Sequence, residues 1–458
     1  MKTHLKLAAF VITGMVAAVV AFPALVRTKP GAGTNGSAVA KVPLAPQGDA
    51  SAVAPARMIL VPHQGDAPLD RRIISAQQAV AAGKTPEASI ENLGWLFIEK
   101  ARISYDPGFF KLAEQCALCL EGRKPGSPAA MLLRGHVLQN LHQFKQAEPL
   151  ARQLVAKRGA PFDYGLLGDV LADLGQLDGA IAAYQSMMDL RPDSQALARV
   201  AHVRWMKGDV SGAVEAMREA ARIVSLRNAG SAAWMNARLA FFQFQAGNTA
   251  GAEASCAAAL DCVANFPPAL VVRGRMQLAV GQSAAAVETL RRAVAGNPLP
   301  EHEWLLSEAL RASGQESEAT TTEARLIARG VADDPRTVSL FLSTHGQQLA
   351  LALSLAEKEL ETRADVFTHD AVAWALAANG RNDDAWKSIG HALAEGTKDA
   401  RTFLHAGVIA ANLGRGDASE WLTRARQLDR LLLPSERRDL DDAEKRLAGT
   451  GTTFTARH

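Results

Sequence analysis

The sequence has few aromatic residues and little net charge. Phe, Trp and Tyr make up 5% of its 458 residues, and 50 Lys and Arg residues nearly balance 47 Asp and Glu residues, for a net charge of +3. A protein whose main partner is a nucleic acid needs a clustered basic face, and no RNA- or DNA-binding motif is present. We therefore expect no nucleic-acid partner. Hydrophobic residues make up 48% of the chain, which is ample for a core.

Cysteine is also scarce, with four residues in the chain. Cys116 and Cys119 match CxxC, but a redox CxxC belongs at a helix start beside a sheet, and this one falls in the middle of an expected helix. We interpret both as small hydrophobic residues. No second CxxC with zinc spacing exists, because Cys256 and Cys262 are six residues apart. A disulfide between these two stays open if the body of the protein is exported.

Motifs of catalysis and cofactor binding are missing. The sequence contains no HExxH, GxSxG, Walker A or kinase signature. Gly31, Gly33 and Gly36 spell the dinucleotide-binding GxGxxG. That motif needs a strand before it and a helix after it, whereas here a Pro-rich stretch follows it. We therefore predict that the protein is not an enzyme and holds no metal or cofactor.

What the sequence does contain is a repeated unit, clearest from Ala160 to Pro192. It reads as two short amphipathic helices joined by a turn at Gly175. Small residues at Gly168 and Ala180 allow the two helices to approach closely, and Pro192 ends the second helix. One such pair cannot bury its apolar face alone, so the unit must recur.

The unit recurs about ten times. Glycine occurs five residues before the repeat alanine in seven units, misses by one residue at Gly346 and Gly414, and is replaced by His142 in the remaining one. Neighbouring alanines are 33 or 34 residues apart, except for a spacing of 39 in the middle of the series. The alanines are Ala113, Ala147, Ala180, Ala213, Ala252, Ala286, Ala319, Ala352, Ala385 and Ala418, and the seven glycines are Gly108, Gly175, Gly208, Gly247, Gly281, Gly314 and Gly380.

This pattern resembles the tetratricopeptide repeat, a helix–turn–helix unit of about 34 residues. The stretches PFDYGLLGD, ARVAHVRWMKGDVSGAVEAMREA and HDAVAWALAANGR look like a bacterial subgroup of mostly uncharacterised members. The resemblance implies an all-α, right-handed solenoid of about ten helix pairs that acts as a scaffold for other proteins. The family has no shared functional site, and the paired Lys and Asn positions of its carboxylate-clamp members are absent.

The N-terminus is predicted to meet a membrane. Leu7–Val26 carries no charge and as a helix would span roughly 30 Å, the thickness of a bilayer core. We favour an uncleaved signal-anchor, with the amino terminus, Lys2 and Lys6 inside and the body in the periplasm of a bacterium. Two alternatives stay open, cleavage after Ala21 to give a secreted or periplasmic protein, and an apolar N-terminus without a targeting role.

Four regions follow from this pattern. Residues 1–27 form the membrane helix, and residues 28–68, rich in Ala, Pro and Gly, form a flexible linker. Residues 69–447 form the solenoid, with a capping helix at Leu69–Ala82 and a solvated one at Pro434–Leu447, capped by Ser435. Residues 448–458 form a disordered tail.

The first helices of such pairs line a concave groove, where exposed tryptophans beside polar residues are typical of recognition surfaces. For Trp205 and Trp374, packing between repeats is the competing interpretation. The groove candidates, counted from the repeat frame, are Trp95, His136, Asn140, Asp169, Asp173, His202, Trp205, Arg275 and Trp374.

Three functional hypotheses remain. The first is a membrane-tethered, non-catalytic scaffold whose groove binds a peptide, helix or subunit of an envelope assembly or secretion complex. The second is an accessory subunit that presents substrate to an envelope enzyme. The third is a stand-alone enzyme. Co-purification with a defined complex separates the first two, and activity of the isolated body would be required for the third.

Overall fold

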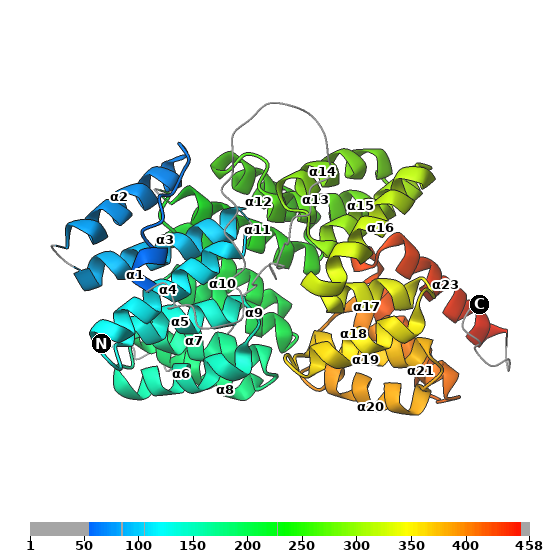
Figure 1. Cartoon of the computed structure of the whole chain (residues 1–458). Coiled ribbons are helices and arrows are strands. Elements are labelled where there is room, and N and C mark those ends of the chain that lie inside the picture. The colour runs from blue at the N-terminus through cyan, green and yellow to red at the C-terminus, as the bar shows by residue number, and fades with distance from the viewer. Residues whose placement is uncertain (1–54, 84–85, 105, 227, 450–458) are drawn as a thin grey trace, which may run out of the picture. The chain divides into compact units, whose positions relative to one another are not determined.

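The computed structural model describes residues 55–83, 86–104, 106–226 and 228–449. Within these residues the chain forms 23 α-helices and one short 3-10 helix, with no strand. The prediction of an all-helical solenoid is confirmed. The chain divides into two compact units, whose described parts are residues 55–137 and 138–449. Each unit is described separately, and the helix labels follow Figure 1.

The smaller unit begins before the expected first helix. Ile59 is buried, and the side-chain amide of Gln77 donates to the backbone oxygens of Ile59 at 2.9 Å and Val61 at 2.8 Å. The backbone at Ile59 and Val61 is therefore held against the helix that contains Gln77, although the sequence placed both residues in a flexible linker, and residues 28–54 lie outside the described residues. The helices of this unit are α1 (Pro55–Met58), α2 (Pro68–Ala82), α3 (Pro86–Ser104), α4 (Gly108–Arg123) and most of α5 (Pro128–Asn140).

The expected membrane segment, Leu7–Val26, also lies outside the described residues. In the part of the chain that the structure describes, no helix has both the length and the apolar character needed to cross a bilayer.

The larger unit continues the helix pairs and ends in a 3-10 helix and a final α-helix. Helix α11 has 17 residues where α9 has 13, which accounts for part of the 39-residue spacing. The helices are α6 (Phe144–Lys157), α7 (Pro161–Asp173), α8 (Leu177–Leu190), α9 (Ser194–Met206), α10 (Val210–Ile223), α11 (Ala229–Gln245), α12 (Thr249–Cys262), α13 (Pro267–Ala279), α14 (Ser283–Gly296), α15 (Pro300–Ala312), α16 (Glu316–Asp333), α17 (Pro335–Thr344), α18 (Leu349–Leu360), α19 (Val366–Ala378), α20 (Asn382–Leu393), α21 (Ala400–Asn412), α22 (Ala418–Gln427), η1 (Asp429–Leu431) and α23 (Pro434–Ala448).

Helices α3 to α22 follow the expected order of ten pairs, and the repeat alanines mark the second helix of each. Nine of the ten alanines have no exposed surface, and Ala418 is 2% exposed. At Gly168, on the first helix of its pair, an added Cβ would lie 2.4 Å from the ring of Tyr184 on the second helix. Small residues are needed at these positions because the helices cross too closely for larger ones.

The turns between the paired helices also follow the glycine series. Gly175, Gly208, Gly247, Gly281, Gly314, Gly346, Gly380 and Gly414 all have φ between 63° and 80°. His142 takes the same left-handed conformation, with φ of 57°. The exception is Gly108, which begins α4 and does not lie in a left-handed turn. Pro107 precedes it as the N-cap of α4, with φ of −67°.

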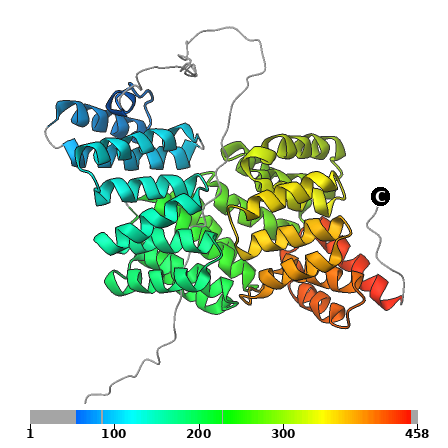
Figure 2. The same cartoon turned by 60° about the horizontal axis from the view of Figure 1, so that its bottom comes forward.

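The larger unit folds back on itself, so that turns of early pairs contact loops of later pairs. At the turn between α7 and α8, the Asp173 backbone oxygen accepts a hydrogen bond from the Ala364 nitrogen at 3.1 Å. At the turn between α9 and α10, the Met206 backbone oxygen accepts one from the Thr397 hydroxyl at 2.6 Å. In Figure 2 the green helices of these early pairs lie beside the yellow and orange helices of the later ones.

A third contact of this kind joins η1 to the end of α11. The Arg430 guanidinium donates to the backbone oxygen of Gln245 at 2.7 Å. This contact and the one at Thr397 join residues 185 and 191 positions apart in the sequence. A solenoid normally couples only neighbouring repeats. Within residues 138–449, the later helix pairs therefore form hydrogen bonds with the early pairs and also contact their own neighbours.

The C-terminal helix differs from the expected solvated cap. Helix α23 begins at Pro434, so Leu433 and not Ser435 is its N-cap. Ser435, Glu436, Leu440 and Ala443 are buried, because this helix packs against α15, α21 and α22. Residues 450–458 of the predicted tail lie outside the described residues.

Candidate functional site

The first helices of the larger unit carry residues at equivalent repeat positions, and we call the side of these helices that bears them the inner face. The residue that lies eleven positions before each repeat alanine marks this face. Each of these marker residues contacts either a neighbouring first helix or the C-terminal segment of the chain. From α7 to α19 these residues are Asp169, His202, Phe241, Arg275, Glu308, Phe341 and Trp374.

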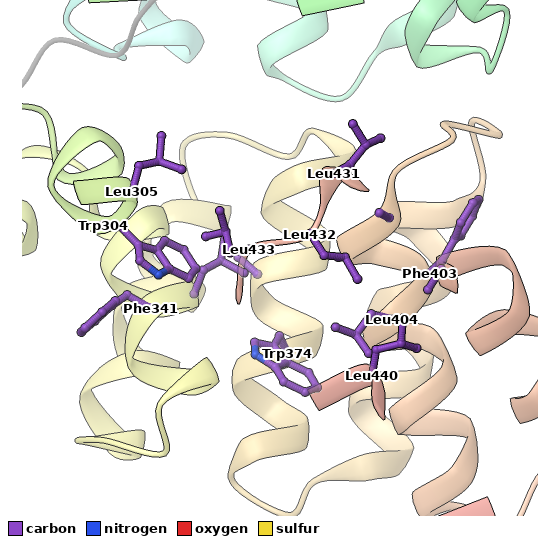
Figure 3. Close-up of a cluster of buried hydrophobic side chains, with 14 of the residues drawn as sticks. Trp304, Leu305, Phe341, Trp374, Phe403, Leu404, Leu431, Leu432, Leu433 and Leu440 are labelled. Carbon is purple, nitrogen blue, oxygen red and sulfur yellow. The ribbon is translucent and has the colours of Figure 1, made fainter. Parts of the chain in front are cut away.

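Between α13 and α21 the inner face is covered by the chain's own C-terminal segment, residues 428–440. Leu431, Leu432, Leu433 and Leu440 are all buried. Figure 3 shows them among aromatic and leucine side chains of the first helices, including Trp374. The burial of four leucines makes this segment part of the hydrophobic core.

Polar side chains of the inner face also hold the backbone of this segment. Arg275 donates to the Leu431 backbone oxygen at 2.9 Å. The Glu308 carboxylate accepts a hydrogen bond from the Ser435 backbone nitrogen at 3.0 Å and another from the Ser435 hydroxyl. Glu308 thus satisfies an amide at the start of α23, which its helix leaves unpaired.

A buried ion pair anchors the next residue. Arg401 on α21 pairs with Glu436, which also accepts from the Leu433 backbone nitrogen at 2.8 Å. Arg401 in turn lies 4.9 Å from the centroid of the Trp304 ring. The inner face therefore binds a largely helical segment, η1, a short connection and the start of α23, through contacts to both its backbone and its side chains.

The stretch formed by α7, α9 and α11 carries a different set of groups. Asp169 accepts from Arg199 at 2.9 and 2.6 Å and from the Tyr184 hydroxyl at 2.5 Å. Burial, and then the charge of Asp169, raise the pKa of Tyr184 well above its ordinary value, so this hydroxyl stays a donor. Both oxygens of the Asp169 carboxylate accept at least one of these bonds, and the residue is buried.

His202 and Arg238 form the second polar contact in this stretch. The Arg238 Nη2 atom lies 3.0 Å from the His202 Nδ1 atom. Burial, and then the charge of Arg238, lower the pKa of His202 well below its ordinary value. His202 is therefore neutral near pH 7 and accepts the hydrogen bond from Arg238.

The two groove tryptophans of the larger unit are buried in packing between helices. Trp205 is 5% exposed and stacks on Phe367 with ring centroids 5.5 Å apart. Trp374 is 9% exposed, stacks on His405 at 4.1 Å and donates to the Thr344 hydroxyl at 3.1 Å. Of the two interpretations left open for these side chains, their surroundings match packing between repeats.

The structure brings some of the other predicted groove residues together and separates the rest. Trp95 and His136 lie in the smaller unit, with ring centroids 5.2 Å apart. Asn140 is buried, with its side chain 3.3 Å from that of Gln139. Asp173 lies at a fold-back contact, 3.2 Å from Arg363. Their role as contacts for a partner stays a prediction.

Burial perturbs Asp173 most among these residues. It raises the pKa of Asp173 to about 7, against the opposing charge of Arg363. Asp173 is therefore partly protonated near neutral pH, even though an arginine lies beside it. The group sits where two distant parts of the array meet.

Sequence reasoning missed three inner-face residues that make specific contacts, Arg238, Glu308 and Arg401. Two of them had a signal. Glu308 is eleven residues before Ala319, as Asp169 is before Ala180, and Arg238 stands fourteen before its repeat alanine, as Arg199 does. Arg401 had none, because its partner Glu436 belongs to a segment outside the repeats.

The cysteines and potential metal ligands form no site in the described residues. All four cysteines are free thiols, so the disulfide left open between Cys256 and Cys262 is not formed. Burial raises the pKa of Cys256 to about 12, which makes it a poor nucleophile. No group of three or more His, Cys, Asp or Glu side chains is arranged to bind a metal in this part of the chain.

Known structures with a similar fold have low sequence identity to this chain. The human IFIT1 dimer with PPP-AAAA is 12% identical, with 82% of this chain and 94% of that one covered and a TM-score of 0.45. The Cut9–Hcn1 hetero-tetramer of the APC/C is 13% identical, with 82% and 90% covered and a TM-score of 0.36. The C-terminal part of a TPR repeat-containing protein from Cytophaga hutchinsonii is 17% identical, with 49% and 91% covered and a TM-score of 0.32.

Comparison with protein families identifies a tetratricopeptide repeat in the chain. The tetratricopeptide repeat model matches residues 164–194, which span most of α7 and all of α8. No curated protein matches the chain. The chain thus contains a tetratricopeptide repeat at the helix pair that best displays the sequence pattern, within an all-helical solenoid.

Proposed function

We propose that the protein is a non-catalytic scaffold that binds a protein partner on the inner face of its solenoid. The observation that supports this is the covered stretch between α13 and α21. There the inner face already binds a peptide segment of the chain itself, from η1 to the start of α23, with Arg275 on a backbone oxygen and Glu308 on a backbone nitrogen. The stretch from α7 to α11 presents similar chemistry, and its Phe241 is partly exposed. A partner segment binds there.

Selection from a random peptide library on the full-length protein tests this proposal. We expect the selected peptides to bind the wild-type chain and to lose most of their affinity for Phe241→Ala. The control is Leu190→Ala, which removes an exposed apolar side chain (55% exposed) from the end of α8. Selection of no peptide, or equal binding to both variants, would contradict the proposal.

The partner is a protein and not a nucleic acid. The net charge of +3 supports this, since it gives no long basic surface for a phosphate backbone. Fluorescence anisotropy with single-stranded RNA and DNA oligonucleotides tests the point. Tight binding that weakens steeply with salt would overturn it.

We further propose that the protein is tethered to the bacterial inner membrane with its body in the periplasm, where it serves an envelope assembly or secretion complex. The uncharged stretch Leu7–Val26 supports this. We expect the native protein to remain with membranes after carbonate and high-salt washes. Mass spectrometry of the native N-terminus provides the decisive measurement. A chain that begins at Phe22 would end the anchor proposal and leave export intact, and a body accessible only from the cytoplasm would overturn the topology.

A further inference from the structure

Arg238 on α11 is held among neutral side chains. Its Nη2 atom lies 3.0 Å from the His202 Nδ1 atom, and its guanidinium carbon lies 4.7 Å and 4.9 Å from the ring centroids of Phe241 and Phe242. Among the residues that the structure describes, no carboxylate oxygen lies within ion-pair distance of it. Its positive charge therefore has no paired negative charge.

Four other partly buried arginines of this unit do have acidic partners. Four guanidiniums each pair with a carboxylate, at 2.6 Å, 3.1 Å and 3.2 Å for the first three. These pairs are Arg199 with Asp169, Arg336 with Asp365, Arg363 with Asp173, and Arg401 with Glu436. Arg437 also has no carboxylate partner, but its guanidinium donates to the backbone oxygens of Asp429, Ala279 and Arg430, whereas the described residues give Arg238 only the His202 ring as acceptor.

Burial makes this exception costly. It lowers the pKa of Arg238 to about 10, with only a distant opposing influence from Glu301. Glu301 itself lies 3.8 Å from Arg275, and the neutral His202 supplies an acceptor but no charge. A cation that is desolvated and unpaired is stabilised when an anion joins it.

Arg238 is also within reach of a ligand. Both Arg238 and the neighbouring Phe241 are partly exposed, and one donor of the guanidinium is used by His202 while others remain. The edge of the Phe241 ring meets Trp205, with centroids 5.3 Å apart. An oxyanion that is attached to an apolar or aromatic group would contact both the guanidinium and the rings.

We propose that Arg238, oriented by His202 and flanked by Phe241, forms an oxyanion site on the inner face for a carboxylate or phosphate carried by an apolar or aromatic group of the peptide partner. This names the chemistry of the partner and so rests on the proposed function. It uses one guanidinium against aromatic rings, and not the paired Lys and Asn positions of carboxylate-clamp repeats, which this sequence lacks. Arg238 is the residue that contacts the ligand, and His202 is a positioning residue.

The test uses small fluorinated probes and the full-length protein, with binding followed by fluorine NMR line widths. 4-Fluorobenzoate carries the carboxylate, 4-fluorophenyl phosphate carries the phosphate, and 4-fluorobenzamide is the neutral control of the same shape. We expect at least one anion to bind about tenfold or more tightly than the amide, because hydrogen bonds to charged groups contribute that much to affinity. Comparison of the two anions identifies the preferred source of the oxyanion.

Variants assign the binding to one side chain. Arg238→Gln should reduce the affinity for the preferred anion to that of the amide, and Arg238→Lys should restore part of it. Arg218→Gln, which removes an exposed arginine from the adjacent helix α10, should leave it unchanged. Circular dichroism of each variant confirms that the helices are intact.

The outcomes separate this inference from the proposed function. Equal binding of anions and amide, or binding that survives in Arg238→Gln, overturns the oxyanion site even if selected peptides still bind the inner face. Anion binding that depends on Arg238, in a protein that selects no peptides, supports the site and overturns the scaffold proposal. If Arg218→Gln weakens binding as much as Arg238→Gln does, the probes respond to general positive charge and the site is refuted.

Discussion

Replacement of Gly175 by alanine tests whether the contact between the α7–α8 turn and the loop at Ala364 stabilises the larger unit. Gly175 has φ of 74°, and an added Cβ would lie 2.2 Å from the Ala364 backbone oxygen. The natural control is Gly380→Ala. Gly380 has φ of 77° and the same place in its repeat, but nothing lies within 4 Å of an added Cβ. The two substitutions share the backbone strain and differ in the contact.

The magnitudes follow from these two positions. A non-glycine residue in the left-handed region costs roughly 1–2 kcal/mol, and this is the whole expected effect of Gly380→Ala. At Gly175 the Cβ overlaps a backbone atom that cannot rotate away, and relief of such overpacking costs about 1–3 kcal/mol more. The hydrogen bond from the Ala364 nitrogen to the Asp173 oxygen is expected to lengthen as well. The free energy of unfolding should therefore fall about twice as far in Gly175→Ala.

Hydrogen exchange with mass spectrometry locates the effect. In Gly175→Ala we expect faster exchange both around residues 170–176 and around residues 361–366, because these segments contact each other. In Gly380→Ala we expect faster exchange only in its own and adjacent pairs, as in an ordinary solenoid. Equal destabilisation of the two variants, or no effect at residues 361–366 in Gly175→Ala, would show that the fold-back contact does not contribute to stability.

Three further predictions concern packing, pH and the C-terminal segment. Ala286→Leu should lower the free energy of unfolding by about 1–3 kcal/mol through overpacking. Ala285→Leu, at an exposed position of the same helix, should not lower it. Equal melting temperatures of the two variants would show that the repeat frame is misplaced. Because burial raises the pKa of Asp173 to about 7, the folded state binds more protons than the unfolded state between about pH 4 and 7. The contribution of Asp173 to stability is thus lost as pH rises through this window, and urea titrations of Asp173→Asn should show a smaller loss than wild type; parallel pH profiles would refute this. Arg401→Met should leave Glu436 buried without its partner and lower the free energy of unfolding by about 3–5 kcal/mol. Hydrogen exchange at residues 428–440 should then become faster. The control Arg424→Met, which removes a surface pair with Glu420, should lower the free energy of unfolding by less than about 1 kcal/mol.

The repeat architecture could be predicted from the sequence because each pair obeys local rules. The alanine at each helix crossing and the residue with positive φ at each turn recur at a nearly constant spacing, and both are set by steric limits within one pair. Even His142 followed the frame, since it adopts the left-handed turn that glycine takes elsewhere. Gly108 departs from the frame, because it begins α4 and does not lie in a left-handed turn.

The fold-back contacts and the covered inner face could not be predicted in the same way. They depend on how the small rotation between neighbouring pairs accumulates, and no local pattern encodes that sum. Gly175 and Gly380 are indistinguishable in the sequence frame, yet an added Cβ would overlap a backbone oxygen at only one of them. The segment that contains Leu431–Leu433 lies outside the repeats, and its position against α13 and α15 depends on pairs more than a hundred residues earlier.

The division of the inner face restricts where a partner binds. Displacement of the C-terminal segment would expose Leu431, Leu432 and Leu433, which are 3–6% exposed in the folded chain. At about 1.5–3 kcal/mol for each buried leucine, that exposure costs roughly 5–9 kcal/mol, as much as the whole binding free energy of a micromolar complex. The loss of the Arg401–Glu436 pair would add to the cost. On the proposed function, a partner therefore gains more by binding at α7, α9 and α11, where the proposed oxyanion site at Arg238 lies and the C-terminal segment does not have to be displaced.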